Sequence, residues 1–579
     1  MKQVLQQLGR YRKDTFLCIA MAALEVLMEI LMPFITAILI DRGLEAANLS
    51  VVYRCGILMV ALALLSLAFG ALAGKCAASA SAGLSANLRQ AIYNNIQTFS
   101  FSNIDKFSVP GLVTRMTTDI TNVQNAFMMV IRIAVRAPLM LVFSYIMCLL
   151  ISPRMSLMFL IAVVFLVVVL GTIMVVTLKI FNQVFQKYDD LNASVQENVS
   201  AIRVVKAFVR EDYENQKFTK ASANLYRLFV KAEGLLAFNN PAMMLAVYFC
   251  IISASWLGAK YIVGDALSTG DLTSLFSYIM SLLMSLMMLS MVVVMISMSM
   301  ASIRRIREVL DETPDLHDPE HPVMEVKDGS IDFNHVSFSY KHGSGKDALT
   351  DIDLHIKSGE TIGVIGGTGS GKSSLVNLIC RLYDVDEGCV KVGGQDVREY
   401  DMEALRNQVS VVLQKNTLFS GTILDNLRWG NPEATDEECM EACKAACADE
   451  FIDRFPDGYH TRIERGGNNV SGGQKQRLCI ARALLKKPKV LILDDSTSAV
   501  DTATDAKIRK AFAEKIPGTT KIIIAQRVSS VEGADRILVL DNGRVNAFDT
   551  HDNLLKTNAI YQEIYESQIK GGGDFDQPA

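Results

Sequence analysis

The chain has 579 residues, a formal net charge of −4 at pH 7 and a mean hydropathy of +0.26, and half of its residues are hydrophobic. A single hydrophobic core does not grow to this length, so two or more domains are expected. The apolar composition indicates a membrane protein, and the negative net charge argues against a nucleic acid as partner.

Six apolar segments dominate the N-terminal half. They cover residues 16–40, 55–74, 137–151, 155–178, 235–259 and 272–303. A membrane-spanning helix needs about 20 predominantly apolar residues, and several of these segments are too long for buried helices of a soluble protein. The sequence therefore predicts a helical domain of six spans, in contact with membrane lipid, over residues 1–313.

The charged flanks predict the orientation of these spans. Arg10 and Arg12 precede the first span, and Arg304 and Arg305 follow the last. Because Lys and Arg favour the cytoplasmic side, both termini are predicted to be cytoplasmic, in a multi-pass protein of the cytoplasmic membrane. The two long inner loops keep helical patterning, and paired helices of their length would reach about 30 Å from the membrane at about 1.5 Å per residue.

Charged residues within the spans have two interpretations. Glu25 and Glu29 lie one turn apart in the first span, and Arg132 and Arg136 lie one turn apart on the approach to the third. Such charges are costly in a membrane and usually face a bundle interior or a cavity. They line a polar cavity that contacts substrate, or they form a structural ion-pair network or contact lipid headgroups; the residues alone leave both interpretations open.

Methionines follow helical spacing along the sixth span. Flexible thioethers suit promiscuous binding of apolar compounds, and plain helix packing is the alternative. The residues are Met280, Met284, Met287, Met288, Met291, Met295 and Met298.

The composition changes after the last span. Asp, His and Pro cluster over residues 314–324, which we interpret as a linker. Beyond it strands and helices alternate, so residues 325–579 are predicted to form an α/β nucleotide-binding domain. Within this domain Cys439, Cys443 and Cys447 recur every four residues, which predicts one helix face; we interpret them as core residues rather than metal ligands.

A phosphate-binding motif begins this domain. Residues 366–373 fit the pattern GxxxxGK[ST] in full, after an apolar strand at residues 361–365 and before a helix at residues 374–380, which is the context that the motif requires. Lys372 should reach the β- and γ-phosphates, and the Ser373 hydroxyl should bind Mg²⁺. The predicted set is Gly366, Gly367, Thr368, Gly369, Ser370, Gly371, Lys372, Ser373 and Ser374.

Two later motifs carry a family resemblance. Val470-Ser471-Gly472-Gly473-Gln474 is followed by the apolar strand at residues 490–494, which ends in Asp494. With the phosphate loop, these motifs resemble the ATP-binding cassette (ABC) family, whose signature is LSGGQ, here with Val in the first position. The resemblance implies ATP and Mg²⁺ as cofactors.

The resemblance also assigns roles residue by residue. It implies that Tyr340 stacks on adenine, that Gln414 senses Mg²⁺ and that Asp494 holds Mg²⁺ through water. Ser471, Gly472, Gly473 and Gln474 would contact nucleotide, and residues 498–501 would form the D-loop. Residues 201–208 resemble the second coupling helix of ABC exporters, and residues 111–115 with Asp119 resemble the stretch after the first. The implied fold is an exporter-type membrane domain of six helices followed by an α/β P-loop ATPase domain.

Two catalytic positions depart from the family pattern. Asp495 stands where such sites usually carry a glutamate base, and Gln526 stands where they usually carry histidine. The carboxylate of Asp495 would sit about 1.5 Å farther back, and a misplacement of about 1 Å can cost on the order of 10²-fold in rate. Gln526 cannot become a cation or shuttle a proton. The sequence therefore predicts ATP binding with slow hydrolysis at this site.

The family sandwiches two ATP molecules between two nucleotide domains, each site using the signature of the opposite chain. An intact signature beside two altered catalytic positions resembles the degenerate-site subunit of bacterial heterodimeric multidrug ABC exporters. This resemblance implies one half of a heterodimeric exporter of small amphipathic compounds, drug-like molecules or lipids, whose partner is a second half-transporter. A slow homodimer, an ATP-gated regulatory membrane subunit and an importer with the exporter fold remain as alternatives.

Overall fold

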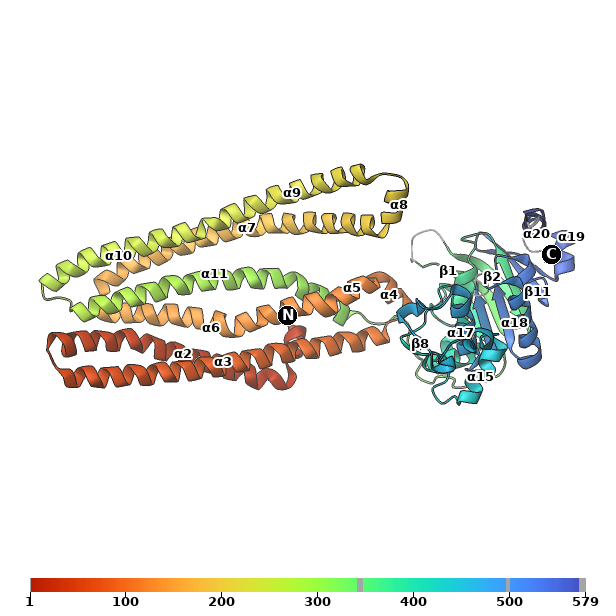
Figure 1. Ribbon diagram of the computed structural model, residues 1–579, viewed down its shortest axis with the longest axis horizontal. Helices are drawn as coiled ribbons and strands as arrows, with labels where there is room; N and C mark the ends of the chain where they lie inside the picture. The colour runs from red at the N-terminus through yellow and green to blue at the C-terminus, as the bar shows by residue number, and fades with distance from the viewer. Residues whose placement is uncertain (1, 341–346, 496–499, 572–579) are drawn as a thin grey trace. The chain divides into compact units, whose positions relative to one another are not determined.

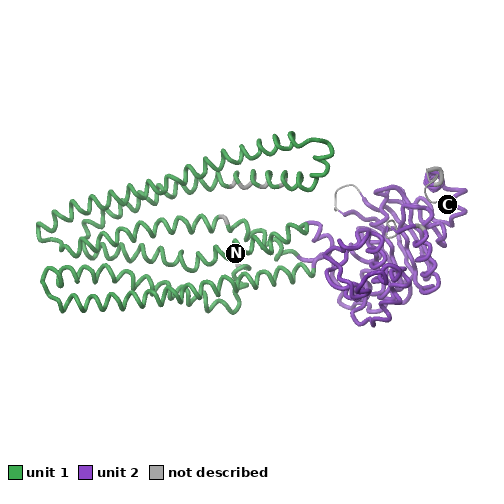
Figure 2. The backbone as a smooth tube through the Cα atoms, viewed as in Figure 1, with its two compact units in different colours: residues 1–98, 107–312 green, residues 99–106, 313–579 purple. Residues whose placement is uncertain are grey.

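The computed structural model describes residues 2–340, 347–495 and 500–571, and these residues form two compact units (Figure 2). The first unit comprises residues 2–98 and 107–312, and the second comprises residues 99–106 and the described residues from 313 onward. A short segment between two membrane helices thus belongs to the second unit.

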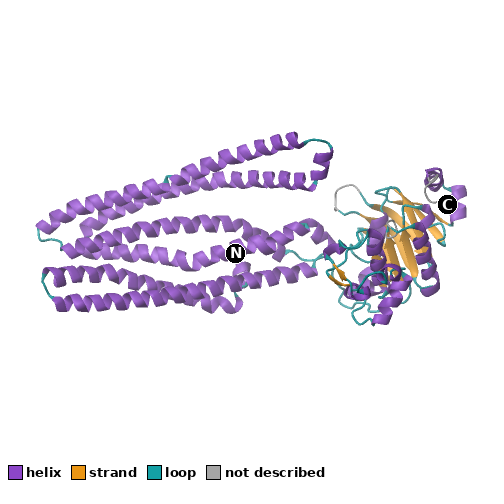
Figure 3. Ribbon diagram, in the orientation of Figure 1, coloured by secondary structure: helices purple, strands orange, loops and turns teal. Residues whose placement is uncertain are grey.

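The first unit is helical (Figures 1 and 3). Its elements are α1 (Lys2–Gln6), α2 (Arg12–Ile38), α3 (Leu49–Thr98), α5 (Val109–Thr114), α6 (Ile120–Ile151), α7 (Pro153–Ser200), α8 (Ile202–Ala207), α9 (Glu211–Ala237), α10 (Asn239–Val263) and α11 (Thr269–Asp311). Within the described residues, six helical runs are long and apolar enough to cross a membrane. The predicted number of spans is therefore confirmed.

The long helices pack as antiparallel neighbours. α2 packs on α3, α6 packs on α11, and α7 packs on α9 and α10 (Figure 1). α3 and α7 continue as single helices of 50 and 48 residues, far beyond their apolar parts, so the predicted helical inner loops are confirmed. The helical run of the third span begins at Val109, well before the apolar part predicted from the sequence.

The second unit contains two main sheets (Figure 3). The larger has the order β12-β11-β3-β10-β9-β6, with β12 antiparallel to β11 and the other neighbours parallel. The smaller is antiparallel and has the order β2-β1-β4-β5. The strands are β1 (Ile331–Phe338), β2 (Leu349–Ile356), β3 (Thr361–Gly366), β4 (Glu387–Val392), β5 (Gln395–Asp396), β6 (Val409–Val412), β9 (Val490–Asp494), β10 (Thr520–Ile524), β11 (Arg536–Asp541) and β12 (Arg544–Asp549).

Helices cover the parallel sheet, and their apolar faces form its core. They include α12 (Lys372–Ile379), α13 (Met402–Gln408), α14 (Ile423–Leu427), α15 (Asp436–Ala445), α16 (Asp449–Ile452), α17 (Gly472–Leu484), α18 (Thr502–Lys515), α19 (His551–Thr557) and α20 (Ala559–Gly571). β9, β10 and the middle of β3 are buried on both faces, as parallel strands between helical layers require.

The cysteine trio is buried in this core, which agrees with the packing interpretation. The single-face prediction is wrong, however, because α15 ends at Ala445 and Cys447 lies beyond it with a φ of 52°.

Segment 99–106 contains most of α4 (Phe101–Phe107), a helix within the inner loop for which helical patterning was predicted. Ser100 and Ser102 donate hydrogen bonds to the carboxylate of Asp315, the latter at 2.5 Å. Asn103 Nδ2 donates to the backbone oxygen of Thr313 at 3.2 Å. These contacts fasten α4 to the start of the second unit.

Candidate nucleotide site

Four parallel strands end at the candidate site. β6, β9, β10 and β3 are neighbours in the large sheet, and their carboxyl ends lie at one edge. The phosphate loop follows β3, Asp494 ends β9, and Gln526 follows β10. Open α/β sheets bind ligands at this edge, and the sheet order gathers residues that are far apart in the sequence.

The phosphate loop has the backbone that its glycines permit. Gly369 and Gly371 have φ values of 81° and 96°, which L side chains rarely adopt. A Cβ atom on Gly366 would lie 2.2 Å from the backbone oxygen of Leu540, whereas one on Gly367 would meet open space. Thr368 is exposed and Ser370 is buried. The loop therefore leaves room for a ligand on the side of Gly367.

Lys372 lies across the mouth of this loop. Its Nζ atom donates to the backbone oxygens of Gly366 and Gly367, both at 2.8 Å. Burial lowers the pKa of the amine, while the nearby carboxylates of Asp494 and Asp495 oppose that shift. A half-buried ammonium held by backbone carbonyls is a suitable group for an anionic phosphate chain.

The carboxylate of Asp494 lies beside the start of α12. Burial raises its pKa above the ordinary range, and a hydrogen bond with the Ser373 hydroxyl opposes the shift. A buried carboxylate next to a serine hydroxyl fits the oxygen ligands that Mg²⁺ prefers. The residues present therefore fit Mg²⁺ bound with phosphate, which Ser373 and Asp494 would hold.

Both the backbone and the side chain of Asp495 are held by hydrogen bonds. Its backbone has a φ of 49°, and its N–H donates to the backbone oxygen of Ile524 at 3.0 Å. Its Oδ2 atom accepts hydrogen bonds from Nε2 of Gln526 at 2.8 Å and from Nε2 of Gln414 at 3.4 Å. The side chains of Gln414, Asp495 and Gln526, which come from three strand ends, thus meet at one carboxylate oxygen.

The signature residues begin α17. Ser471 caps this helix: its Oγ accepts the N–H of Gln474 at 3.3 Å, and Oε1 of Gln474 accepts the N–H of Ser471 at 2.8 Å. This reciprocal capping box orders the turn, and Ser471 and Gly472 are exposed. None of the hydrogen bonds found among the described residues joins Ser471–Gln474 to the phosphate loop. The exposed helix N-terminus is suited to an anion from outside the chain.

Tyr340 is half exposed at the edge of the site. Its ring meets Phe338 and Tyr383 edge-on, with centroid distances of 4.9 and 5.1 Å, and its hydroxyl lies 3.0 Å from Oγ of Ser374. Edge-to-face neighbours leave the ring face available for stacking. This tyrosine therefore fits an adenine beside the phosphate loop.

Tyr383, which sequence reasoning missed, links this aromatic group to α4. Its hydroxyl donates to Oδ2 of Asp105 at 2.9 Å, and its ring lies 6.1 Å from that of Phe101. Burial first, and then the hydrogen bond with Asp105, raise the pKa of Tyr383. The local sequence around Tyr383 carries no signal for a partner 278 residues away.

Residues 498 and 499 of the expected D-loop lie outside the described residues. Its last residue, Asp501, caps α18 by accepting the N–H of Thr504 at 2.9 Å.

Three of the four charged residues discussed for the spans form ion pairs. Arg136 of α6 donates to Glu25 at 3.0 Å and to both oxygens of Glu29 at 2.7 and 2.8 Å. Gly70 of α3 makes room for this group, because a Cβ there would lie 3.0 Å from Oε1 of Glu25. Arg132 of α6 lies beside Gly74, which like Gly70 belongs to α3. The structure thus contains the ion-pair part of the predicted network.

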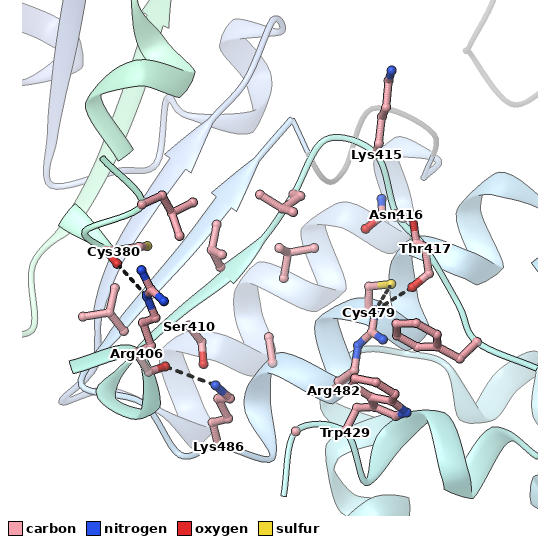
Figure 4. A pocket seen from close by; sticks show the side chains of 18 residues that line it. Cys380, Arg406, Ser410, Lys415, Asn416, Thr417, Trp429, Cys479, Arg482 and Lys486 are labelled. Atoms are coloured by element: carbon pink, nitrogen blue, oxygen red, sulfur yellow. Dashed lines mark hydrogen bonds between the residues drawn. The ribbon is translucent and has the colours of Figure 1, made fainter. Parts of the chain in front are cut away.

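A groove of about 400 Å³ lies on the nucleotide unit (Figure 4). The rings of Phe419 and Trp429 stack in its wall at 4.0 Å, and Arg482 donates to the backbone oxygen of Thr417 at 2.9 Å. The buried atoms Ser410 Oγ and Asn416 Oδ1 have no hydrogen-bond partner among the described residues. Unpaired buried oxygens favour an occupant that brings hydrogen-bond donors.

Comparisons with known proteins agree with this arrangement. The family model of the ABC transporter transmembrane region matches residues 15–307, and that of the ABC transporter matches residues 349–498. The uncharacterized ABC transporter ATP-binding protein YfiB of Bacillus subtilis is 35% identical over 569 residues, which cover 98% of this chain and 99% of that protein. The uncharacterized ABC transporter ATP-binding protein Rv1273c of Mycobacterium tuberculosis is 33% identical over 568 residues, which cover 97% of this chain and 97% of that protein.

A solved structure has the same fold. A bacterial Atm1-family ABC exporter with ATP bound superposes with a TM-score of 0.83 at 25% identity, over 96% of this chain and 99% of that one. The predicted fold class, six membrane helices followed by an ABC ATPase domain, is therefore confirmed.

Proposed function

The chain belongs to the ABC transporter family, in its exporter-type branch, and from that premise we propose that it is one half of a heterodimeric exporter of amphipathic compounds. In this proposal residues 1–313 form the membrane domain with both termini in the cytoplasm, residues 314–324 are the linker, and residues 325–579 bind ATP and Mg²⁺.

The observation that carries the proposal is that the side chain of Asp495 is short and is held by hydrogen bonds. A general base must take a proton from water within hydrogen-bond reach, and here the shorter carboxylate is held by the amides of Gln414 and Gln526. A glutamine amide stabilises the charged carboxylate but accepts no proton from it. Lys372, Ser373 and Asp494 retain the groups that bind nucleotide. The site is therefore suited to holding ATP and poorly suited to hydrolysing it.

The exposed signature supports a partner chain. Ser471 and Gly472 begin a helix of 13 residues, whose N-terminal N–H groups favour a phosphate. We propose that they complete a second ATP site, built on the Walker motifs of the partner. That second site would carry most of the hydrolysis.

The groove and α8 support the same pairing. α8 has no buried residues, and the adjacent Phe208 and Val209 are 72% and 80% exposed. Its Arg203 and Lys206 can donate hydrogen bonds, while the groove offers stacked aromatic rings and the unpaired oxygens of Ser410 and Asn416. We propose that α8 enters the corresponding groove of the partner and that the partner's coupling helix occupies the groove of this chain, as the resemblance to exporters implies for coupling helices.

The surface of the sixth span supports an amphipathic substrate. Five methionines of α11 are 41–56% exposed within this chain: Met280, Met284, Met287, Met288 and Met291. Unbranched thioether side chains adapt to apolar ligands of different shape. Glu25, Glu29, Arg132 and Arg136 would add charge to the same membrane domain, so the proposed substrates combine an apolar body with a polar group.

ATP turnover tests the pairing. The full chain should be purified alone and together with a candidate partner half-transporter, and ATP hydrolysis should be measured in lipid nanodiscs. We expect turnover in the pair and little in the chain alone. Robust hydrolysis by the chain alone as a homodimer would contradict the proposal.

Export is tested in sealed vesicles that contain the pair. ATP-dependent movement of an amphipathic dye in the outward sense is the expected result. Movement in the inward sense would instead support the importer alternative.

A further inference from the structure

The C-terminal helix α20 carries a side chain that binds the loop of Gln526. Nε2 of Gln568 donates to the backbone oxygen of Gln526 at 2.8 Å, and Oε1 of Gln568 accepts the backbone N–H of Val528, also at 2.8 Å. A carboxamide presents a donor and an acceptor side by side. One side chain thus holds the main chain on both sides of Arg527.

The helix that carries Gln568 is itself fixed to the core. Tyr561, Ile564, Tyr565 and Gln568 follow the spacing i, i+3, i+4, i+7 and share one helix face. Tyr561 is fully buried, its hydroxyl lies 2.7 Å from Nδ1 of His551, and Ile564 and Tyr565 pack against the core. Gln568 is therefore presented by an anchored helix.

The held loop leads directly to the nucleotide site. Gln526 follows β10, where the N–H of Ala525 donates to the backbone oxygen of Val364 at 3.2 Å. Its side chain donates to Oδ2 of Asp495 at 2.8 Å. Among the described residues, the side chains of Gln568 and Gln526 connect α20 to Asp495 by hydrogen bonds. A change in the backbone at Gln526 would therefore move the donor that faces Asp495.

We propose that Gln568 is a positioning residue for the ATP site: it fixes the backbone at Gln526 and Val528 so that the side chain of Gln526 stays on Asp495. This inference rests on the proposed function only in that the site binds ATP. When Gln526 is displaced, Oδ2 of Asp495 loses its hydrogen bond at 2.8 Å, and more of its negative charge then acts on the nearby Lys372, whose positive charge the phosphates require. Gln568 acts through Gln526.

Gln568→Ala tests the proposal in the purified full chain, with ATP and Mg²⁺ as the probe. We expect faster hydrogen exchange at the Val528 amide, which loses its acceptor, and an affinity for ATP that falls about two- to ten-fold, the effect of one or two hydrogen bonds. Ser567→Ala is the matched control, because the hydrogen bond of its hydroxyl among the described residues goes to the backbone oxygen of Ile564 in the same helix, at 2.8 Å. The control should change neither quantity.

A double-mutant cycle separates positioning from general destabilisation. Gln526→Ala should lower ATP affinity, and adding Gln568→Ala should lower it no further, because both act on one contact. Gln568→Glu keeps an acceptor for Val528 and should restore slow exchange at that amide without restoring full affinity. Additive losses, or unchanged exchange and affinity in Gln568→Ala, would overturn the inference.

The outcome is independent of pairing. ATP binding is measured on this chain alone, so a catalytically active homodimer would contradict the heterodimer and leave the role of Gln568 standing. Failure of the unaltered chain to bind ATP would instead contradict the nucleotide site itself.

Discussion

Gln526 and Asp495, the two residues that depart from the family pattern, are hydrogen-bonded to each other at 2.8 Å. They therefore form one structural unit. A longer carboxylate and an imidazole would have to replace them together, because each side chain sets the position of the other.

The double change Asp495→Glu with Gln526→His should raise hydrolysis at this site. It returns the carboxylate toward the water position and supplies a group that titrates near neutral pH. We expect a gain of up to about 10²-fold, the cost of a misplacement near 1 Å. The gain should be measured in the pair with the partner's catalytic glutamate changed to glutamine. No gain over either single change would contradict the assignment.

Asp495→Asn should change turnover of the pair only modestly, by about two-fold or less, because in the proposed function this carboxylate contributes little hydrolysis. The equivalent Glu→Gln change in the partner should nearly abolish turnover, consistent with loss of a general base worth about 10²–10⁴-fold. Steady-state ATP hydrolysis of both complexes checks this. A larger loss from Asp495→Asn would mean that the degenerate site has been assigned to the wrong chain.

Gly473→Gln should collapse hydrolysis by the pair although the Walker motifs of this chain are untouched. Its side chain would stand at the start of α17, where the backbone must approach phosphate closely. The loss of stabilisation at a developing charge is typically about 10²–10³-fold. The control is the matching change in the partner's signature, which should do less. Equal losses would show that the two sites are equivalent.

Tyr383→Phe should weaken the attachment of α4 to the nucleotide unit while leaving ATP affinity within about two-fold. It removes the hydrogen bond to Asp105 and keeps the ring between Tyr340 and Phe101. The expected loss is about 1 kcal/mol, measured by thermal unfolding. Asp105→Asn retains an acceptor and should cost less. Equal stability of Tyr383→Phe and the unaltered chain would exclude a role for this contact.

Arg136→Met should destabilise the membrane unit by about 3–5 kcal/mol, because it leaves the carboxylates of Glu25 and Glu29 unpaired. Neutralising all three residues together should cost much less. Unfolding in detergent or lipid, compared between the single and the triple variant, checks this prediction. If the triple variant were as unstable as the single one, lost packing rather than unpaired charge would be the cause.

Features defined by local chemistry were predicted closely. The acidic strand spans Val490–Asp494 as expected, and β3 ends at Gly366, one residue beyond the expected end. Both depend on an apolar run and the residues directly after it, which a sequence displays.

Features that depend on packing were not predictable in this way. Helical spacing places Glu25 and Glu29 on one face of α2, but their ion pairs with Arg136 depend on how α2 packs against α6. Gln568 binds a loop 42 residues earlier in the chain, and no local pattern distinguishes it from an ordinary surface glutamine. The roles of the nucleotide-site residues also stay predictions, although the structure brings Gln414, Asp495 and Gln526 together.

The membership of segment 99–106 in the nucleotide unit affects biosynthesis. Roughly 200 residues separate Lys106 from Thr313, and at about 5–20 residues per second a ribosome needs about 10–40 s to make them. Tyr383 is made later still, 278 residues after Asp105, so Phe101 and Asp105 are without this partner for longer than that. Segment 99–106 therefore joins its own unit only after the late domain has been synthesised, and an ATPase domain that begins at residue 313 would lack the contacts of this segment with Asp315 and Tyr383.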